Sequence, residues 1–331
     1  MRVAIIGATH WHVDLYYVPA LKGAGADIVA VHDPDAEALQ RVCEGLDCPR
    51  YTDHGELLDK EAPDLVFAHA PHAQMAALAM DLVSRHQPFH MEKPMGVDWT
   101  EVSTLATKAQ TEDVWNSAAL VSRYYGVVQR LRQLRDEGDL GAPIRYYHSL
   151  LAGSPLRYAE WGVGWMLDPA LAGGGPLWNF GPHVVDLFLY LVDEDVAQVE
   201  CWTSDHVYNL AIEDYALIRL TGRSGALGVG EVSYTMPAGY ERFFSLTTDR
   251  LHCGGSSMGA GSVVIRDGDE VTCDGPDSDT VYDVYVADTL RRFAAGERAM
   301  ATVRDMERAL RVMDAARQSA RSGELVELRP A

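Results

Sequence analysis

The amino-acid sequence predicts an N-terminal Rossmann fold of the α/β class, followed by a C-terminal α+β unit with an antiparallel sheet. The chain has 331 residues, which is more than a single hydrophobic core usually accommodates. Short β-prone runs alternate with helical stretches up to about residue 120, and this alternation is typical of a parallel sheet. Later β-prone runs follow one another without helices, which favours an antiparallel sheet.

The first unit is expected to comprise residues 1–122 and to bind a dinucleotide. Its strand runs are almost continuously apolar, as in a sheet that helices cover on both faces. The runs, each followed by a segment with helix-like spacing, are residues 3–6, 28–32, 65–70 and 88–91.

The second unit, residues 123–331, is expected to bind substrate. It begins with a helix over about 125–137 that ends at Gly138. Its expected strands are residues 144–151, 196–204, 215–220, 226–234 and 243–248. A Gly-, Trp- and Pro-rich stretch between the first two strands leads into a helix over about 178–191, and such loops often carry substrate contacts. The tail from residue 282 is expected to be helical and to pack back toward the first unit.

Composition excludes several classes of partner. The formal net charge of -20, from 48 acidic and 28 basic residues, repels nucleic-acid phosphates and anionic lipid headgroups. We therefore expect neither a nucleic acid nor a membrane as partner. The five cysteines lack the close spacing of a zinc site or a disulfide framework. Because the chain also opens directly into a strand pattern, without an apolar leader, we expect a cytoplasmic protein.

The loop after the first strand reads Gly7-Ala8-Thr9-His10-Trp11-His12. A dinucleotide-binding loop usually reads G-x-G-x-x-G, and only its first glycine is present here. The loop can still present backbone N–H groups to a phosphate. We expect Thr9 to cap the following helix, and His10 or His12 to donate to an anion.

Asp33 follows the second strand, about 26 residues beyond Gly7, where dinucleotide folds place an acid that binds the adenosine ribose. Asp35 lies nearby and no arginine is adjacent, so a 2′-phosphate would be repelled. NAD is therefore favoured over NADP as cofactor. The alternative is that Asp33 only starts the helix that contains Pro34.

Four histidines raise the question of a metal. They are expected at the carboxyl ends of the first and fourth strands, and they are His10, His12, His69 and His72. Imidazoles suit zinc, copper or nickel. Since no carboxylate or cysteine is spaced to complete the site, and a dinucleotide claims the same pocket, we expect no functional metal.

Two further segments carry a candidate proton-handling pair. Met91-Glu92-Lys93-Pro94 follows the fifth strand, where partial desolvation would lower the pKa of Lys93. A glycine-rich stretch then leads to Asn179 and His183, which are four residues apart and share a helix face. A lysine and a histidine can together handle the proton in alcohol oxidation.

With these segments the chain resembles the Gfo/Idh/MocA family of sugar and polyol oxidoreductases over nearly its whole length. The resemblance implies that Glu92 and Lys93 lie beside the nicotinamide and that Pro94 often follows a cis bond. It also implies that Pro71 and His72 form a turn against the cofactor. A histidine usually found a few residues later is replaced by Met75.

The resemblance also implies roles in catalysis. His183 would be the general base for the substrate hydroxyl, Lys93 would polarise the same oxygen, and Asn179 would bind substrate. The family commonly has aspartate at the position of Asn179, and asparagine keeps the geometry but cannot accept a proton. Asp186 is expected to cap or to form a salt bridge. Further candidates for contact with a carbohydrate, one arginine and three aromatic residues, are Arg123, Tyr158, Trp161 and Trp165.

Three functions remain open. The first is an NAD-dependent dehydrogenase of a cyclic polyol or sugar, or a ketone reductase in the opposite direction, because both Lys93 and His183 are present. The second is a redox-assisted glycoside-cleaving or epimerising enzyme. The third is a protein that senses NAD(P) without catalysis, for which Asn179 and the missing glycines argue. The resemblance further implies a homodimer or homotetramer formed through the open face of the antiparallel sheet.

Overall fold

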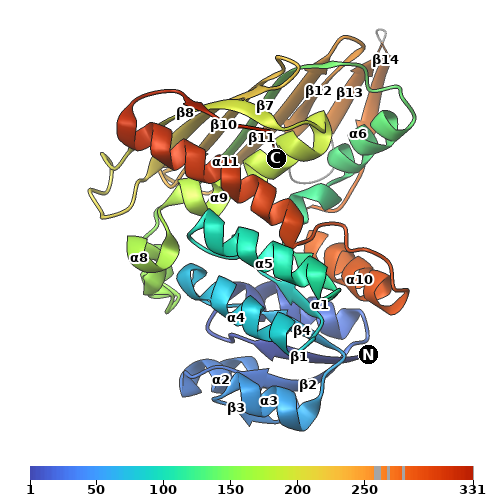
Figure 1. The fold of residues 1–331 in the computed structure, drawn as a ribbon, viewed down its shortest axis with the longest axis vertical. Coiled ribbons are helices and arrows are strands. Elements are labelled where there is room, and N and C mark those ends of the chain that lie inside the picture. The colour runs from blue at the N-terminus through green and yellow to red at the C-terminus, as the bar shows by residue number, and fades with distance from the viewer. Residues whose placement is uncertain (257–261, 267–268, 278–279, 331) are drawn as a thin grey trace.

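The structure, a computed structural model, describes residues 1–256, 262–266, 269–277 and 280–330. Within these residues, two β-sheets lie toward opposite ends of the long axis (Figure 1). Helices α5 (Trp99–Thr111), α9 (Pro176–Val192) and α11 (Val303–Ser322) lie between the sheets, and α11 packs against both of the others. The predicted fold class is confirmed: a parallel Rossmann sheet is followed by a mostly antiparallel sheet.

The first sheet has six parallel strands in the order β3-β2-β1-β4-β5-β6. The strands are β1 (Arg2–Ile6), β2 (Asp27–His32), β3 (Arg50–Tyr51), β4 (Leu65–Ala68), β5 (Phe89–Met91) and β6 (Asn116–Ala118). The predicted strands match β1, β2, β4 and β5, whereas β3 and β6 were missed because neither of these short segments is an apolar run. The strand order reverses at β1, between β2 and β4, and crevices that bind ligands open at such points.

Helices join these strands and cover the sheet. They are the π-helix η1 (Val13–Tyr17), α1 (Val18–Gly23), α2 (Ala36–Val42), α3 (His54–Glu61) and α4 (His72–Ser84), with α5 preceding β6. Aspartates cap three of them, since the side chains of Asp35, Asp53 and Asp98 accept hydrogen bonds from the first turns of α2, α3 and α5. The short 3-10 helix η2 (Val121–Tyr124) and α6 (Gly126–Asp136) lead to the second sheet.

The second sheet has nine strands in the order β14-β13-β12-β11-β7-β10-β9-β8-β15. They are β7 (Pro143–Ala152), β8 (Val196–Ser204), β9 (Tyr215–Gly222), β10 (Leu227–Ser233), β11 (Tyr240–Thr248), β12 (Leu251–Ser256), β13 (Ser262–Arg266), β14 (Asp269–Cys273) and β15 (Val326–Glu327). The expectation of a purely antiparallel sheet needs one correction, because β7 and β10 are parallel. The chain crosses over through α9 between β7 and β8, so β10 enters the sheet in the direction of β7.

One face of this sheet is covered by helices and the other is open. Helix α9 packs against β7, β9 and β10, and α11 packs against β8. The hydroxyl of Tyr146 on β7 donates to the carbonyl oxygen of Val184 on α9, at 2.6 Å. On the open face, large apolar side chains remain exposed, among them Trp202, Leu227 and Phe243.

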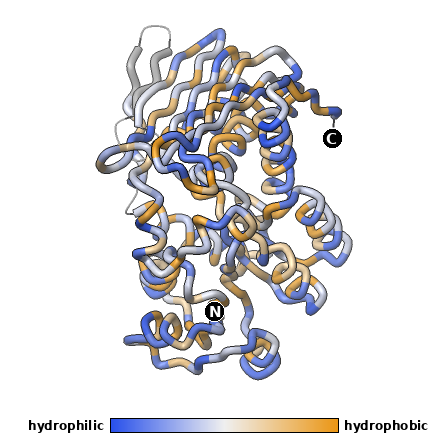
Figure 2. The backbone as a smooth tube through the Cα atoms, turned by 90° about the vertical axis from the view of Figure 1, so that its left-hand side faces the viewer, coloured by the Kyte–Doolittle hydropathy of each residue, from blue (hydrophilic) through white to orange (hydrophobic). Residues whose placement is uncertain are grey.

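The C-terminal segment returns to the first sheet before it reaches the second. Helix α10 (Val281–Ala294) packs against α1 and η1. The backbone N–H of Ala118 on β6 then donates to the carbonyl oxygen of Ala301 at 3.0 Å. Figure 2 shows the C-terminus beside the second sheet, where β15 pairs with β8.

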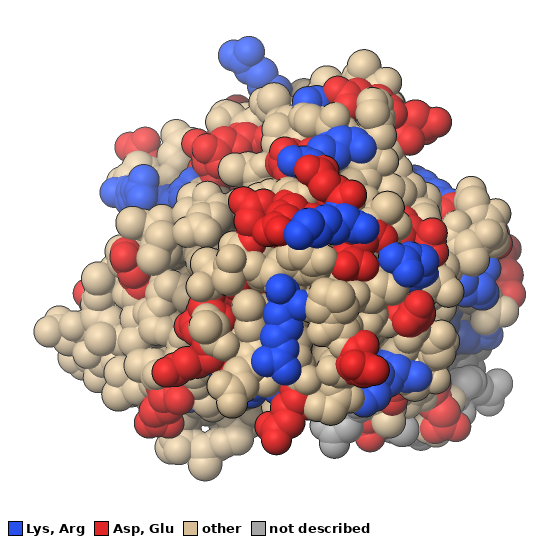
Figure 3. Space-filling view, turned by 90° about the horizontal axis from the view of Figure 1, so that it is seen from below, with Lys and Arg blue, Asp and Glu red and all other residues tan. Residues whose placement is uncertain are grey.

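On the face seen in Figure 3, basic side chains are interspersed with acidic ones and form no continuous patch. No helix within the described ranges combines the length and the apolar character needed to cross a bilayer. All five cysteines are free thiols.

Candidate functional site

A cavity of about 780 Å³ opens where the strand order of the first sheet reverses. It lies beyond the carboxyl ends of β1, β2 and β4. Among its lining residues are five that the sequence predicted for the cofactor and one predicted for substrate: Gly7, Thr9, His10, Asp33, Pro71 and Trp165. The position and lining are those expected of a dinucleotide crevice.

Gly7 makes the sharp turn at the end of β1 that opens this cavity. Its φ of +90° is a conformation that side chains rarely adopt, and a Cβ atom there would lie 2.0 Å from the carbonyl oxygen of His69. Its N–H donates to the carbonyl oxygen of His32 at 2.9 Å. The turn therefore requires glycine, and it leaves the backbone bare where a pyrophosphate would approach.

Asp33 holds the nucleotide loop in place. One oxygen of its buried carboxylate accepts from the backbone N–H of Thr9 at 2.7 Å and from the Thr9 hydroxyl at 2.8 Å. The other oxygen accepts from the N–H of Asp35 at 2.8 Å. Two expectations are corrected. Thr9 caps no helix, because its hydroxyl turns to Asp33, and the helix after Asp33 is capped by Asp35 instead.

The cavity wall is acidic at the end where β2 and α3 meet. Four carboxylates line it, those of Asp33, Asp35, Asp53 and Asp81. Arg85 also lines it, which the sequence did not indicate, but its guanidinium donates to Asp81 at 3.0 Å and to Asp59 at 2.9 Å. The surplus of negative charge would repel a 2′-phosphate on the adenosine ribose, the group that distinguishes NADP from NAD.

Several buried histidines of the described structure have a ring nitrogen without a hydrogen-bond partner, among them His69 and His72. Nδ1 of His69 lies 3.2 Å from the carbonyl oxygen of Ile6, and Nδ1 of His72 lies 2.8 Å from that of Ala172. Because a carbonyl only accepts, each Nδ1 is the donor and each Nε2 is an acceptor without a hydrogen bond in the described structure. Burial lowers the pKa of His69 to about 4 and that of His72 to about 3, so both rings are neutral near pH 7.

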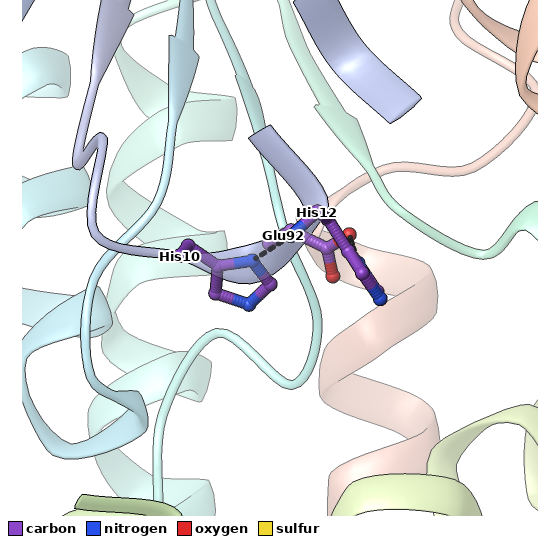
Figure 4. A group of neighbouring side chains, drawn as sticks. All are labelled: His10, His12 and Glu92. Carbon is purple, nitrogen blue, oxygen red and sulfur yellow. Dashed lines mark hydrogen bonds and ion pairs between the residues drawn. The ribbon is translucent and has the colours of Figure 1, made fainter. Parts of the chain in front are cut away.

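His10, His12 and Glu92 form a compact group beside the loop. Figure 4 shows the two histidines on one stretch of chain, with Glu92 reaching them from the segment after β5. Their potential ligand atoms lie within 4.8 Å of one another. Sequence spacing gave no sign of this carboxylate, because the contact joins two separate strands of the sheet. In the described structure the group of potential metal ligands is thus His10, His12 and Glu92, and not the four histidines that the sequence suggested.

Hydrogen bonds already use this glutamate. Nδ1 of His12 lies 2.7 Å from one oxygen of Glu92, and the Tyr17 hydroxyl donates to that oxygen at 3.0 Å. The ligands of a tetrahedral zinc ion, bound at about 2.0 to 2.1 Å, are roughly 3.3 Å apart, so a metal would have to open the His12–Glu92 contact. Burial opposes ionisation of Glu92, but the nearby imidazoles and Lys93 outweigh it and hold its pKa well below the ordinary value.

Lys93 lies directly after this glutamate, and the Lys93–Pro94 bond is cis, as the resemblance implied. Its side chain is 4% exposed, and its ammonium donates to the side-chain oxygen and to the backbone oxygen of Asn179. Burial lowers the pKa of Lys93 to about 8; the Glu92 carboxylate opposes this shift and the Arg242 charge adds to it. Lys93 thus carries a proton that it can release near neutral pH.

Asn179 is held from its other side by two tyrosines. Its amide nitrogen donates to the hydroxyl oxygens of Tyr158 and Tyr234, each at 2.9 Å. With both amide hydrogens used in this way, the amide oxygen is directed at Lys93. Tyr158 was predicted as a substrate contact, and Tyr234 was not predicted at all.

His183 lies one helical turn beyond Asn179 on α9. Its side chain is 8% exposed, and Nδ1 lies 3.4 Å from the hydroxyl of Ser122. Burial lowers the pKa of His183 well below its ordinary value, and the charges of Lys93 and Arg242 lower it further. The ring is therefore neutral at pH 7 and able to accept a proton.

Arg123 is part of a buried ion-pair network. Its guanidinium makes two hydrogen bonds to Asp186, at 2.9 and 2.6 Å, and others to Asp305 and to the carbonyl oxygen of Met300. Tyr190 packs on the same guanidinium, 4.4 Å from ring centre to Cζ. These contacts favour a structural role over the predicted substrate contact. Asp186 forms the expected salt bridge.

The predicted aromatic residues fall in different surroundings. The segment between β7 and α9, which carries Tyr158, Trp161 and Trp165, contains α7 (Arg157–Glu160), the 3-10 helix η3 (Gly164–Leu167) and α8 (Pro169–Ala172). Trp165 reaches the cavity and meets the ring of His72 edge-on at 4.9 Å. Trp11 stacks on His10 at 4.1 Å and approaches Tyr158 at 5.3 Å. Trp161 is 42% exposed and contacts Tyr158 from outside.

Sequence reasoning also missed Arg242, on β11. It lies on the face of the sheet from which Tyr146 bonds to α9, the helix of His183, and its charge lowers the pKa of both Lys93 and His183. A signal was present in the sequence. Arg242, Phe244 and Leu246 alternate along the strand, and a lone cation on an otherwise apolar face is a departure from the usual pattern.

Two protein-family models match this chain. One, described as an oxidoreductase family with an NAD-binding Rossmann fold, matches residues 1–119. The other, described as the GFO/IDH/MocA C-terminal domain, matches residues 128–253. Together the two models cover the first sheet, strands β7 to β11 of the second sheet, and the two segments that contain Lys93 and the pair Asn179 and His183.

Individual named proteins are similar to parts of this chain. D-xylose 1-dehydrogenase (NADP(+)) of Hypocrea jecorina is 26% identical over 178 residues, covering 50% of this chain and 45% of that protein. The matched segments span about half the length of the curated relatives.

Solved structures are similar over the whole chain. An oxidoreductase from Agrobacterium radiobacter, in complex with NAD+, L-tartaric acid and magnesium, has a TM-score of 0.85 and 19% identity, covering 99% of this chain and 98% of that chain. For myo-inositol 2-dehydrogenase from Lactobacillus plantarum, the TM-score is 0.83 with 20% identity, and 99% of each chain is covered. At such identities the likeness shows the fold alone.

Proposed function

Because the chain belongs to the Gfo/Idh/MocA family of NAD-binding oxidoreductases, we propose that it oxidises a hydroxyl group of a cyclic polyol or sugar, or reduces the corresponding ketone. The names of the xylose and myo-inositol dehydrogenases support this class of substrate. The observation that carries the proposal is the buried contact of Lys93 with Asn179, one helical turn from His183.

We propose NAD as the cofactor, because the cavity fits it. The bare turn at Gly7, the acceptor Nε2 of His69 and the carboxylate of Asp33 match a pyrophosphate, an amide group and a ribose. The proposed cofactor contacts are Gly7, Thr9, His10, Trp11, His12, Asp33, Pro71, His72, Glu92 and Lys93. When bound, the nicotinamide ring accepts or supplies the hydride. The name of the D-xylose 1-dehydrogenase relative specifies NADP. The support for NAD therefore comes from the acidic wall of the cavity and not from this similarity.

His183 and Lys93 have different roles in the proposed reaction. In oxidation the neutral imidazole of His183 takes the hydroxyl proton, and the ammonium of Lys93 stabilises the negative charge that develops on the same oxygen. In reduction His183 returns the proton. Asn179 keeps the ammonium in place and adds no negative charge beside the reacting oxygen. An aspartate there would pair with Lys93 and weaken its pull on the substrate.

We further propose that the chain forms a homodimer or homotetramer through the open face of the second sheet. Trp202, Leu227 and Phe243 support this, because exposed apolar side chains on one face commonly mark an interface. The free cysteines support the expected reducing, cytoplasmic compartment. Analytical ultracentrifugation of the wild type and of Trp202→Glu tests the interface, and the variant should shift toward monomer.

The test of the proposed activity is NADH formation with inositols, pentoses, hexoses and their acids and phosphates. Calorimetric titration with NADH and NADPH establishes cofactor binding beforehand. Net NADH release with a free sugar supports the dehydrogenase. Tight NADH binding without turnover across the panel would contradict it and favour the NAD-sensing alternative, whereas bond cleavage without net NADH would favour the redox-assisted one.

A further inference from the structure

Arg242 points toward the catalytic side of the second sheet. In the antiparallel pair of β11 and β7, Arg242 lies opposite Leu150 and Phe244 lies opposite His148. Residues opposite each other project from the same face of a sheet. That face is covered by α9, which carries His183, because Tyr146 on the same side of β7 bonds to Val184 of α9. Arg242 therefore faces the candidate site.

The guanidinium of Arg242 lacks a counter-charge in the described part of the chain. Its Nε is buried without a hydrogen-bond partner. Its Cζ lies 5.5 Å from the centre of the Tyr240 ring. Arg123, by contrast, binds two carboxylates. The chain holds 48 acidic and 28 basic residues, so an arginine left without an acid is not explained by a shortage of acids.

The positive charge is concentrated beside the reacting groups. Burial is the largest cause that lowers the pKa of Lys93, His183 and His148, and the charge of Arg242 lowers each of these pKa values further. Glu92 is the carboxylate nearest in sequence to Lys93, and its oxygens are used by His12, Tyr17 and the Lys93 backbone N–H. A substrate entering here meets two cations, Lys93 and Arg242, and only one of them is assigned to the reacting hydroxyl.

We propose that Arg242 binds an anionic group of the substrate, so that the preferred substrate is a sugar or polyol carrying a carboxylate or a phosphate. The inference rests on the proposed function and adds the substrate class to it. A guanidinium matches both anions with two parallel hydrogen bonds. The overall charge of -20 repels anions at a distance, so an anionic substrate requires a local cation, whereas a neutral sugar would leave a partly buried charge without a partner.

The test compares matched substrates at pH 7: glucose with glucuronate and glucose 6-phosphate, galactose with galacturonate, and myo-inositol with its monophosphate. The measured quantity is kcat/KM of the anionic substrate divided by that of its neutral counterpart. This ratio should be well above one in the wild type and should fall about 10²-fold in Arg242→Gln, because the variant loses charge-assisted hydrogen bonds to the anion. Arg242→Lys, which keeps the charge, should lose less. The carboxylate and phosphate arms show which anion is taken.

Arg321→Gln is the matched control. Arg321 is an exposed arginine near the end of α11, away from the open face of the second sheet, so its loss removes an equal charge without reaching the site. It should leave the ratio unchanged. A wild-type ratio near one, or equal ratios in the wild type and in both Arg242 variants, would overturn the proposal.

Binding separates this proposal from the proposed activity. If no sugar is oxidised, calorimetry of glucuronate, glucose 6-phosphate and glucose with the NADH-bound protein still applies. Anionic sugars should bind at least about tenfold more tightly than glucose, and the difference should vanish in Arg242→Gln. That result would keep the anion site while the dehydrogenase fails. Equal binding of neutral and anionic sugars in a protein that does oxidise sugars would overturn the anion site alone. Thermal unfolding of each variant verifies that it is folded.

Discussion

The ammonium group of Lys93 donates a hydrogen bond to the side-chain oxygen of Asn179, 86 positions further along the chain. The lysine follows a strand of the first sheet, and the asparagine begins the helix that covers the second. Tyr158 and Tyr234 fix the asparagine in turn. The orientation of the lysine therefore depends on how the two halves of the molecule pack, and the following predictions test what this contact accomplishes.

Removing either member of the proton-handling pair should slow catalysis without loss of cofactor. We expect Lys93→Ala and His183→Ala each to lower kcat by about 10²-fold or more, because general acid–base groups contribute factors of this size. Steady-state kinetics and NADH titration measure the two quantities. NADH affinity should stay within a few-fold of the wild type, and wild-type turnover in both variants would refute the assignment.

The rate should depend on pH through the same two groups. Burial lowers the pKa of Lys93 to about 8, so the polarising charge is lost, and kcat/KM falls, as the pH rises above about 8. Burial also lowers the pKa of His183 well below 6.5, so the base is still neutral at pH 6.5 and the acid limb lies lower. In Asn179→Asp a new carboxylate favours charged Lys93 and should move the alkaline limb upward by about one unit or more. Asn209→Asp, the same change in an exposed loop, should not move it.

Replacing Gly7 should cost more stability than its backbone angle explains. Gly25 also has a positive φ, of 73°, but a Cβ atom there meets nothing within 4 Å. Gly25→Ala should thus cost only the left-handed conformation, about 1 to 2 kcal/mol. Gly7→Ala adds the collision with the backbone of His69, and we expect a clearly larger loss together with weaker NADH binding. Denaturant unfolding compares them, and equal losses would contradict the close approach.

The charge of Asp33 should decide between the two cofactors. We expect Asp33→Asn to weaken NADH binding about tenfold and to reduce the preference for NADH over NADPH, because a neutral amide makes weaker hydrogen bonds than a carboxylate. Asp47→Asn removes an exposed acid remote from the cavity lining and should change neither value. Calorimetric titration measures both cofactors. A preference for NADPH in the wild type would contradict the interpretation of the acidic wall.

Arg123 should matter for stability more than for substrate binding. Arg123→Ala leaves the buried Asp186 unpaired and should lower the free energy of unfolding by about 3 to 5 kcal/mol. Arg130→Ala removes an exposed arginine, whose ion pair with Glu137 spans 3.9 Å, and should cost less than about 1 kcal/mol. Unchanged stability with a raised KM in Arg123→Ala would restore the substrate role expected from sequence.

Local patterns predicted most of the fold. The strand expected over residues 196–204 is observed as β8 with the same bounds, and the helix expected over 125–137 is α6 with one residue fewer at each end. Strands that depend on distant partners were missed. Examples are β3, with two residues, and β12, whose Gly254 and Gly255 weaken the β signal. The parallel pairing of β7 with β10 depends on the crossover through α9, which periodicity does not encode.

The site was predictable where a motif is continuous in sequence. Lys93, Asn179 and His183 lie in two such motifs; a hydrogen bond joins Lys93 to Asn179, and His183 follows Asn179 by one helical turn on α9. Tyr234 and Arg242 were missed because strand order, not spacing, brings Tyr234 to Asn179 and places Arg242 on the face covered by α9. The ion pairs of Arg123 could not be predicted for the same reason, since Asp186 and Asp305 lie on helices remote from it in sequence.

The central claim is that Lys93 and His183 act on the same substrate oxygen. A crystal structure of the ternary complex with NADH and the best substrate of the kinetic panel measures this most directly. The account predicts that Nζ of Lys93 and a ring nitrogen of His183 both lie about 2.6 to 3.2 Å from one substrate oxygen, whose carbon faces the nicotinamide. A substrate bound productively against the nicotinamide, with its reacting oxygen in contact with neither side chain, would contradict the account.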